Sequence, residues 1–303
     1  MDAWIWIGLA FFAAAMQSVR TAGQKVLTGE LDSASVALVR FLFGAPFAYL
    51  YLLALMRHYG TGLPTPNLEF ILLTLAASTT QIAGTVLLVH LFSLRNFAVG
   101  NAYARTEALL TALVGTVLFA ELLSLAGWVA IAVSVAGVVL ISLARTGTGA
   151  AALLTGLWNR AALIGVASGL GFALSSLLIR RASLSFGDER YLFTAGLTLA
   201  TMVTMQTVIL SLYLLLTQPG QFRVIARRWR VSLFIGATSI LGSFGWFTAM
   251  TIERAAYVKA VGQVELVMTL AISMLFFRER TTARELVGMA LLSLGIVVLL
   301  VTL

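Results

Sequence analysis

The chain has 303 residues, of which 60% are hydrophobic and 11% are charged, with a formal net charge of +8 and no cysteine. Soluble domains carry about 25% charged residues, so the composition excludes an ordinary soluble protein, and the lack of cysteine excludes disulfides and thiolate metal sites. The basic residues are scattered near the ends of apolar blocks, which indicates contact with lipid phosphates and not a nucleic-acid-binding surface.

The apolar residues come in long blocks that are nearly free of charge. Each block has about 18–23 residues, enough to cross a hydrocarbon core of about 30 Å as a helix, and their continuous apolar character argues against barrel strands. The first block begins with Asp2 and not with basic residues, so we expect a retained span rather than a signal peptide. The longest loops are expected at about 57–68, 145–159 and 218–230, and ten helices are predicted at about 3–24, 34–56, 69–93, 97–119, 122–144, 160–180, 190–216, 231–251, 255–277 and 284–302.

An internal repeat divides the chain into two halves of five helices. We predict a first repeat over 1–146, a connecting loop over 147–159 and a second repeat over 160–303. Because five is an odd number, the second half must enter the membrane in the opposite sense. Inverted repeats are typical of secondary transporters, which bind substrate near the bilayer midplane between the halves, although a repeat is also an economical way to build a bundle. A displacement of 158 residues aligns, without a gap, Glu107 with Glu265, Thr111 with Thr269, Glu121 with Glu279 and Gly137 with Gly295.

Two acidic residues, Glu107 and Glu265, occupy equivalent positions in the fourth helix of each half. Each is expected about ten residues into its helix, or about 15 Å deep. A charge near the bilayer centre costs at least about 2.5–3.5 kcal/mol, so we expect the pair to line a site. The alternatives are a structural ion pair, for instance with Arg40 or Arg105, and a protonated glutamate that hydrogen-bonds across helices.

Further polar residues are predicted on the same helical face as each of the two glutamates. At about 100° per residue, this face also holds Asn101, Arg105 and Thr111 in the first half, and Lys259, Gln263 and Thr269 in the second. The first helix carries a second polar stripe at i, i+3, i+4 and i+7 spacing, made of Gln17, Arg20, Thr21 and Gln24. Two further candidates are Arg40, which has the alternative of snorkelling to the interface, and Trp246, which lies in the middle of its helix.

The charges predicted inside the membrane have both signs, with a surplus of two positive charges from Arg20, Arg40, Arg105 and Lys259 over Glu107 and Glu265. A site with both signs suits a zwitterion such as an amino acid, and the surplus suits a phosphate or carboxylate. A permanent organic cation fits least well because it would be repelled. We expect the glutamates to couple protons or bind a substrate amine, and Lys259, Arg105 and Arg40 to bind the anionic group.

Several of these motifs resemble the EamA-type ten-helix members of the drug/metabolite transporter superfamily. The resemblance covers essentially the whole chain and rests on the two five-helix repeats, on Leu38-Val39-Arg40-Phe41, on the helix-ending Glu121 and Glu279, and on Val264-Glu265-Leu266-Val267. The last stretch is similar to the Glu-Pro-Val of that family, with Leu266 in place of the proline. The resemblance implies an exporter or exchanger of amino acids, nucleosides, sugar phosphates or drugs.

The orientation in the membrane receives two conflicting predictions. Many members of the family place both termini in the cytoplasm. The positive-inside rule, with eleven basic residues near one face and five near the other, favours both termini outside.

No catalytic motif of the HExxH or GxSxG type and no phosphate-binding glycine loop is present, so we expect no enzyme, no cofactor and no metal. We predict an all-α, multi-pass protein of the plasma (bacterial inner) membrane, monomeric or homodimeric, in contact with lipid. It would export or exchange a small-molecule substrate by alternating access, using a proton or counter-substrate gradient. A flippase for lipid-linked or phospholipid head groups is one alternative, and a membrane scaffold or sensor without transport is the other.

Overall fold

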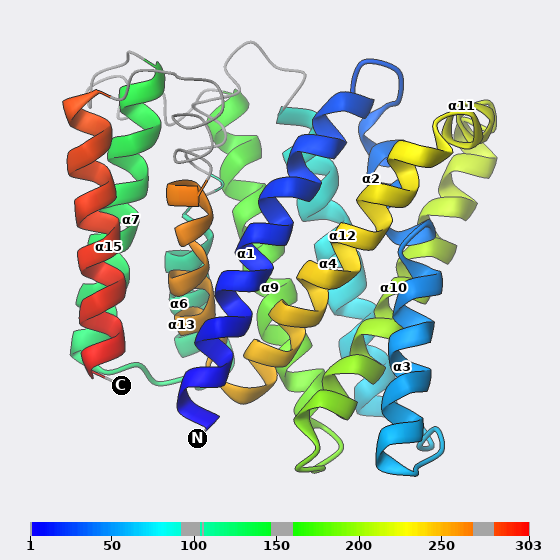
Figure 1. Ribbon diagram of the computed structural model, residues 1–303, viewed down its shortest axis with the longest axis horizontal. Coiled ribbons are helices and arrows are strands. Elements are labelled where there is room, and N and C mark those ends of the chain that lie inside the picture. The colour runs from blue at the N-terminus through cyan, green and yellow to red at the C-terminus, as the bar shows by residue number, and fades with distance from the viewer. Residues whose placement is uncertain (1, 92–103, 105, 147–159, 269–281, 303) are drawn as a thin grey trace.

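The computed structural model describes residues 2–91, 104, 106–146, 160–268 and 282–302, and the regular secondary structure of these residues is α-helical throughout. The all-α prediction is confirmed. The helices shown in Figure 1 are α1 (Asp2–Leu27), α2 (Ser33–Leu42), α3 (Ala45–Tyr59), α4 (Leu68–Leu91), α6 (Glu107–Leu118), α7 (Leu125–Thr146), α9 (Arg160–Leu184), α10 (Tyr191–Thr217), α11 (Gln221–Arg227), α12 (Trp229–Ile252), α13 (Ala255–Gly262) and α15 (Ala283–Thr302).

Many large apolar side chains are exposed on the outside of the bundle, while many small polar ones are buried. Leu125 and Leu216 are 81% and 84% exposed, whereas Ser78 and Thr111 are 0% exposed. This distribution is what a bilayer stabilises. In the described residues six spans are long and apolar enough to cross a membrane: α1, α2 with α3, α4, α9, α10 and α12, while α6, α7 and α15 contribute shorter apolar helices. The chain is therefore an integral, multi-pass membrane protein, and the total of ten spans stays a prediction.

The span predicted at 34–56 consists of two helices, α2 and α3, that meet at a bend. Gly44 lies at the bend, where an added Cβ would come within 2.7 Å of the carbonyl oxygen of Arg40. Pro46 follows in the first turn of α3, where its missing N–H costs nothing. The bend turns Arg40 and the last part of α2 toward the interior of the bundle, where Arg40 is buried.

The loop predicted at 218–230 contains a short helix, α11, so this part of the prediction is wrong. Ile225 is 2% exposed and belongs to a cluster with Leu27 and Leu214, while Arg223 and Arg227 are exposed. The apolar side of α11 packs against α2 and α12, within a cluster that also holds residues of α1 and α10, and this packing stabilises a helix too short to be stable alone.

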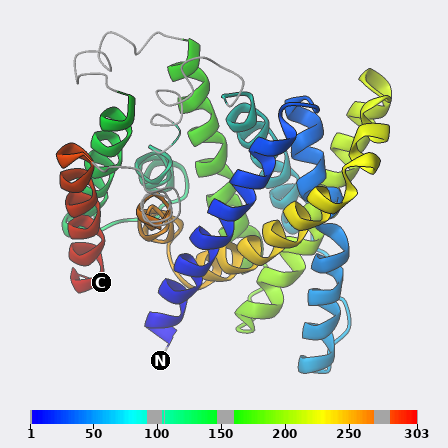
Figure 2. The ribbon, with the colours of Figure 1, turned by 45° about the horizontal axis from the view of Figure 1, so that its top comes forward.

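Helices of the predicted first half pack against helices of the predicted second half. α1 contacts α12, α4 contacts α9, α6 contacts α13 and α7 contacts α15. In the predicted repeat, α1 corresponds to α9, α4 to α12, α6 to α13 and α7 to α15. If each helix is exchanged for its counterpart, the same four pairs result. α7 and α15 stand together at one edge of the bundle, and α3 and α10 at the opposite edge (Figure 1). In the turned view of Figure 2, α6 and α13 lie side by side and are seen nearly end-on. The predicted domain limits themselves stay a prediction, because the connecting loop at 147–159 lies outside the described residues.

The contact between α7 and α15 brings the two backbones together. An added Cβ on Gly137 would lie 2.5 Å from the backbone nitrogen of Leu292, and one on Gly295 would lie 2.3 Å from Oγ of Ser134. Only glycine fits such an approach. The two glycines are the pair that the sequence repeat aligns, so they meet across the same seam.

Candidate functional site

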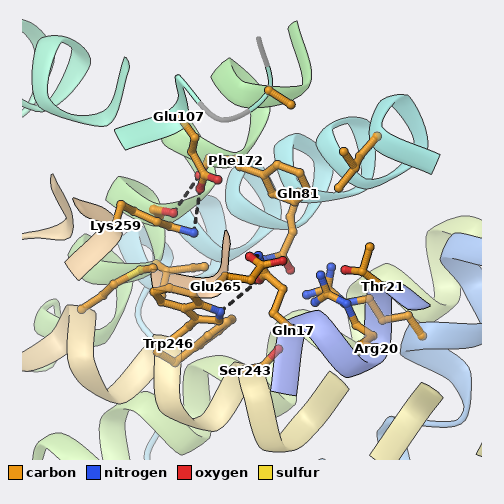
Figure 3. A pocket seen from close by; sticks show the side chains of 17 residues that line it. Gln17, Arg20, Thr21, Gln81, Glu107, Phe172, Ser243, Trp246, Lys259 and Glu265 are labelled. Atoms are coloured by element: carbon orange, nitrogen blue, oxygen red, sulfur yellow. Dashed lines mark hydrogen bonds and ion pairs between the residues drawn. The ribbon is translucent and has the colours of Figure 1, made fainter. Parts of the chain in front are cut away.

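A cavity lies at the centre of the bundle, where α1, α2, α4, α6, α9, α12 and α13 converge. It leaves about 50 Å³ free for the centres of water molecules, which is room for a few waters. Figure 3 shows the side chains that surround it. The lining residues are Gln17, Arg20, Thr21, Arg40, Gln81, Leu88, Ala104, Glu107, Phe172, Ser176, Ile179, Ser243, Trp246, Phe247, Met250, Lys259 and Glu265.

Among the described residues, the helical backbone begins at one glutamate and breaks just before the other. α6 begins at Glu107, and Thr106 lies in a turn; α13 ends at Gly262, Gln263 lies in a turn, and helical backbone resumes over 264–268. The prediction that Glu107 lies ten residues into a continuous helix is therefore wrong. A one-residue turn leaves no mark on apolar periodicity, and the helix dipole favours an acidic residue at the first position of α6. Interrupted helices at the midplane are a recurrent feature of transporter sites.

Glu107 forms an ion pair with Lys259 across the contact between α6 and α13. Lys259 Nζ lies 2.6 Å from Glu107 Oε1, and the two side chains are only 11% and 20% exposed. The ammonium also lies 4.6 Å from the centre of the Trp246 ring, a distance at which a cation and an aromatic face attract. The structural ion pair considered for the glutamates thus exists, with Lys259 as the partner of Glu107, and it lines the cavity at the same time.

Glu265 is held by an amide that a tryptophan orients. Trp246 Nε1 donates to Gln17 Oε1 at 3.1 Å, and Gln17 Nε2 donates to Glu265 Oε2 at 2.8 Å. Because an indole N–H can only donate, it fixes the oxygen of the amide toward itself and the NH₂ group toward the carboxylate. Glu107, Lys259, Trp246, Gln17 and Glu265 therefore form one continuous chain of contacts (Figure 3).

Two arginines, Arg20 and Arg40, line the same cavity and are each 5% exposed. Arg40 Nη1 donates to Thr85 Oγ1 at 3.2 Å, and its guanidinium lies 5.1 Å from the centre of the Phe41 ring. Snorkelling of Arg40 to the interface is therefore excluded. A buried guanidinium that meets a neutral hydroxyl is poorly compensated, which favours an anionic group of a ligand beside it.

The other predicted site residues do not line the central cavity where the structure describes them. Gln263 is 7% exposed and borders an adjoining cavity of about 30 Å³. Neither polar atom of its side chain has a hydrogen-bond partner in the described part of the chain. Thr111 does not line either cavity; its hydroxyl donates to the carbonyl oxygen of Glu107 at 2.8 Å, which is how a threonine inside a helix commonly satisfies itself. The remaining predictions, Asn101, Arg105 and Thr269, lie outside the described residues.

Sequence reasoning missed several lining residues, of which Gln81 is the most informative. It lies in the middle of apolar α4, and its Oε1 accepts a hydrogen bond from Gln206 Nε2 at 2.7 Å. Amides within membrane spans are costly, so a search for every polar residue inside a span would have found both glutamines. Phe172 and Ser243 carry no comparable signal, because aromatic residues and serines are common in such helices.

Sequence reasoning also missed an ion pair between Arg180, near the end of α9, and the motif residue Glu121. Arg180 Nε lies 3.2 Å from Glu121 Oε1. Burial raises the pKa of Glu121, while Arg180, Arg254 and the backbone N–H of Ala255 act to lower it and Glu253 acts to raise it. The prominence of Glu121 in the repeat was visible in the sequence, but its partner was not.

The comparisons with known proteins agree with this architecture. The sequence profile of the EamA-like transporter family matches residues 159–301. A solved structure, described only as "Crystal structure of protein", is similar over 100% of this chain and 99% of its own, with a TM-score of 0.72 and 16% sequence identity. It shows the fold alone. No curated protein matches the chain. The match over residues 159–301 places the chain in the drug/metabolite transporter superfamily.

Proposed function

We propose that the protein is a secondary active transporter, an exporter or exchanger, that moves a small zwitterionic or anionic metabolite by alternating access. The observation that carries this proposal is the central cavity, in which Glu107 paired with Lys259, Glu265 held by Gln17, and two buried arginines line one space. Membership of a transporter family supports the general role.

The charges around the cavity support the substrate class. The described lining contains three basic residues, Arg20, Arg40 and Lys259, and two acidic ones, Glu107 and Glu265. Lys259 is neutralised by Glu107 at 2.6 Å, whereas Arg40 meets the neutral hydroxyl of Thr85, so the end of the cavity beside Arg40 is the positive end. A carboxylate or phosphate would bind there, and an amine would bind at Glu265. A fixed organic cation would meet repulsion from the same arginines.

The amide of Gln263, which has no hydrogen-bond partner among the described residues, supports a polar ligand. A buried group without a hydrogen bond costs about 1–3 kcal/mol, and Gln263 faces the adjoining cavity with both polar atoms unsatisfied in the described part of the chain. A hydroxyl, amine or carboxyl of a substrate would satisfy it. Its position in the turn after α13 brings it next to Lys259 and Glu265 in the lining of that cavity.

The size of the cavity supports movement during transport. About 50 Å³ of free space holds a few waters and no metabolite, so binding requires the surrounding helices to separate. In the proposed cycle the arginines hold the anionic group, and Glu265 takes up a proton or the substrate amine. Protonation of Glu265 removes the charge to which Gln17 donates, and so weakens that hydrogen bond.

A thermal-shift screen of amino acids, nucleosides, sugar phosphates and amines on detergent-purified protein tests the substrate class. We expect zwitterions or anions to raise the melting temperature, and a screen in which only quaternary amines do so would contradict the proposal. Counterflow in proteoliposomes then tests transport. Glu265→Gln should abolish gradient-driven flux and preserve counterflow, while Glu69→Gln, at an exposed ion pair, should change neither. Wild-type protein that moves no solute under any gradient would favour a scaffold or sensor instead.

A further inference from the structure

Arg180 gathers four acceptors from separate parts of the chain. Its Nη1 lies 2.6 Å from the carbonyl oxygen of Met250, 3.3 Å from that of Thr251 and 2.6 Å from that of Glu253. Its Nε lies 3.2 Å from Glu121 Oε1. One guanidinium at the end of α9 thus binds both the last turn of α12 and the link between α6 and α7.

The electrostatics of this cluster match the helix ends that meet there. The last carbonyls of α12 have no partner within their own helix and carry the negative end of its dipole, so a cation is favourable beside them. The carboxylate of Glu121 lies near the backbone N–H of Ala255, the first residue of α13, which stabilises its charged form. Arg180 and Glu121 therefore both contact the turn between α12 and α13.

The cluster lies directly beyond the central cavity. On α9 the cavity is lined by Ser176 and Ile179, and Arg180 is the next residue; on α12 it is lined by Phe247 and Met250, whose carbonyl Arg180 binds. Both helices end at the face of the bundle where α1 begins and α15 ends (Figure 1). We refer to it as the terminal face. The Arg180 contacts therefore join elements that border the cavity on the side of the terminal face.

The neighbouring residue shows how an ordinary surface ion pair differs. Arg181 lies 3.3 Å from Glu69, and these side chains are 62% and 53% exposed. The side chains of Arg180 and Glu121 are 19% and 13% exposed. Exposed pairs contribute little to stability, whereas separating a buried pair leaves charges and carbonyls without partners. Loss of the Arg180 contacts is therefore more costly than loss of the exposed pair of Arg181 and Glu69.

We propose that Arg180 is a positioning residue that closes the central cavity toward the terminal face, and that opening on this face requires it to release Glu121 and the end of α12. The inference rests on the proposed transport function. Arg180 does not line the cavity, so its effect is on the exchange between open and closed forms and not on ligand contact.

Site-specific labelling tests the closure without any substrate. The chain has no cysteine, so Ser243→Cys in the cavity lining gives a single reactive thiol. A membrane-impermeant thiol reagent is applied to each side of vesicles, and Gly62→Cys, in the exposed loop between α3 and α4, reports which side is the terminal face. We expect Arg180→Gln to raise the labelling rate at position 243 at least tenfold from the terminal face, and Arg181→Gln to leave it unchanged.

The same variants distinguish a positioning role of Arg180 from a general effect on the stability of the protein. Arg180→Gln should lower the maximal counterflow rate at least tenfold while the ligand-induced shift in melting temperature persists. If Arg180→Gln does not fold, Glu121→Gln and Arg180→Lys replace it. Glu121→Gln should raise terminal-face labelling, and Arg180→Lys, which keeps the charge and loses the planar fork, should do so by a smaller factor.

Two results would overturn the inference. One is folded protein of lower melting temperature whose labelling rate from the terminal face equals that of the parent in every variant. The other is an equal rise from both faces, which would indicate general loosening. Failure of the transport proposal is distinguishable, because wild-type protein that shows no counterflow but has Arg180-dependent closure contradicts only the proposed function.

Discussion

Gly262→Ala offers a sharp test of the contact chain that links the two glutamates. An added Cβ on Gly262 would lie 2.0 Å from Cη2 and 2.7 Å from Cζ3 of Trp246. No real Cβ is tolerated at such distances, so the indole ring has to move. Movement would separate the ring from Lys259, now 4.6 Å from its centre, and its N–H from Gln17, now 3.1 Å away.

The energetic effect can be estimated from its parts. Overpacking costs about 1–3 kcal/mol, and the better helix propensity of alanine offsets up to about 1 kcal/mol of this. The lost hydrogen bond is worth about 1 kcal/mol and the cation–π contact about 0.5–2 kcal/mol. If these two contacts hold the transport-competent site, the loss of about 2 kcal/mol lowers the counterflow rate by about 30-fold, while the protein stays folded.

The assay combines counterflow in proteoliposomes with equilibrium unfolding in mixed micelles. Gly8→Ala is the matched control, because Gly8 lies in α1 with no atom within 4 Å of an added Cβ; it should retain wild-type counterflow. Trp246→Phe lacks the ring atoms that the new methyl would strike, so the double variant with Gly262→Ala should cost at least about 1 kcal/mol less than the sum of the single variants. Additive costs, or full activity in Gly262→Ala, would refute the described packing.

Three further predictions follow from charges and from sidedness. Lys259→Met breaks the pair with Glu107 and leaves its carboxylate without a partner. This single change should lower the melting temperature more than the double change Lys259→Met with Glu107→Gln does. Equal losses in a thermal melt would contradict this prediction. The terminal-face labelling rate of the cavity cysteine in the parent, divided by that in Glu121→Gln at the same pH, should rise as the pH falls through the raised pKa of Glu121. Protonation removes the charge that Arg180 binds, and the ratio cancels the ordinary pH dependence of thiol reactivity. A ratio that does not change with pH would refute the pairing. Impermeant labelling of Gly220→Cys, next to α11, should occur only from the cytoplasmic side and that of Gly62→Cys only from outside, as the positive-inside rule predicts; the reverse pattern would support the orientation implied by the family.

Apolar length and spacing were sufficient to predict most of the fold, because a bilayer imposes a strict relation between them and a helical span. The breaks were not predictable in the same way. Gly44 and Gly262 are marked by low helix propensity, but glycines are common in membrane helices, and only the neighbour that approaches each one shows why it is there. The helix α11 was missed because its stability comes from packing against α2 and α12, which no local pattern records.

The candidate site could likewise be predicted only in part from the sequence. Glu107, Glu265, Lys259 and Arg40 were found because charges inside a membrane are costly and rare. The pairing of Glu107 with Lys259 was left open by the sequence, since a repeat shows which positions correspond but not which side chains touch. Arg180 was counted only as a basic residue near a helix end, because its acceptors are backbone carbonyls of α12 that any sequence would supply.

The glycine seam between α7 and α15 restricts which motions are available to the bundle. Two backbones in direct contact, as at Gly137 and Gly295, have no intervening side chains that can change rotamer to let them slide or separate. The helices can rotate about that edge of the bundle, but the edge itself cannot open. Displacements during a transport cycle should therefore increase with distance from it and be largest at the opposite edge, where α3 and α10 pack through larger side chains such as Tyr51 and Leu55 against Gly196.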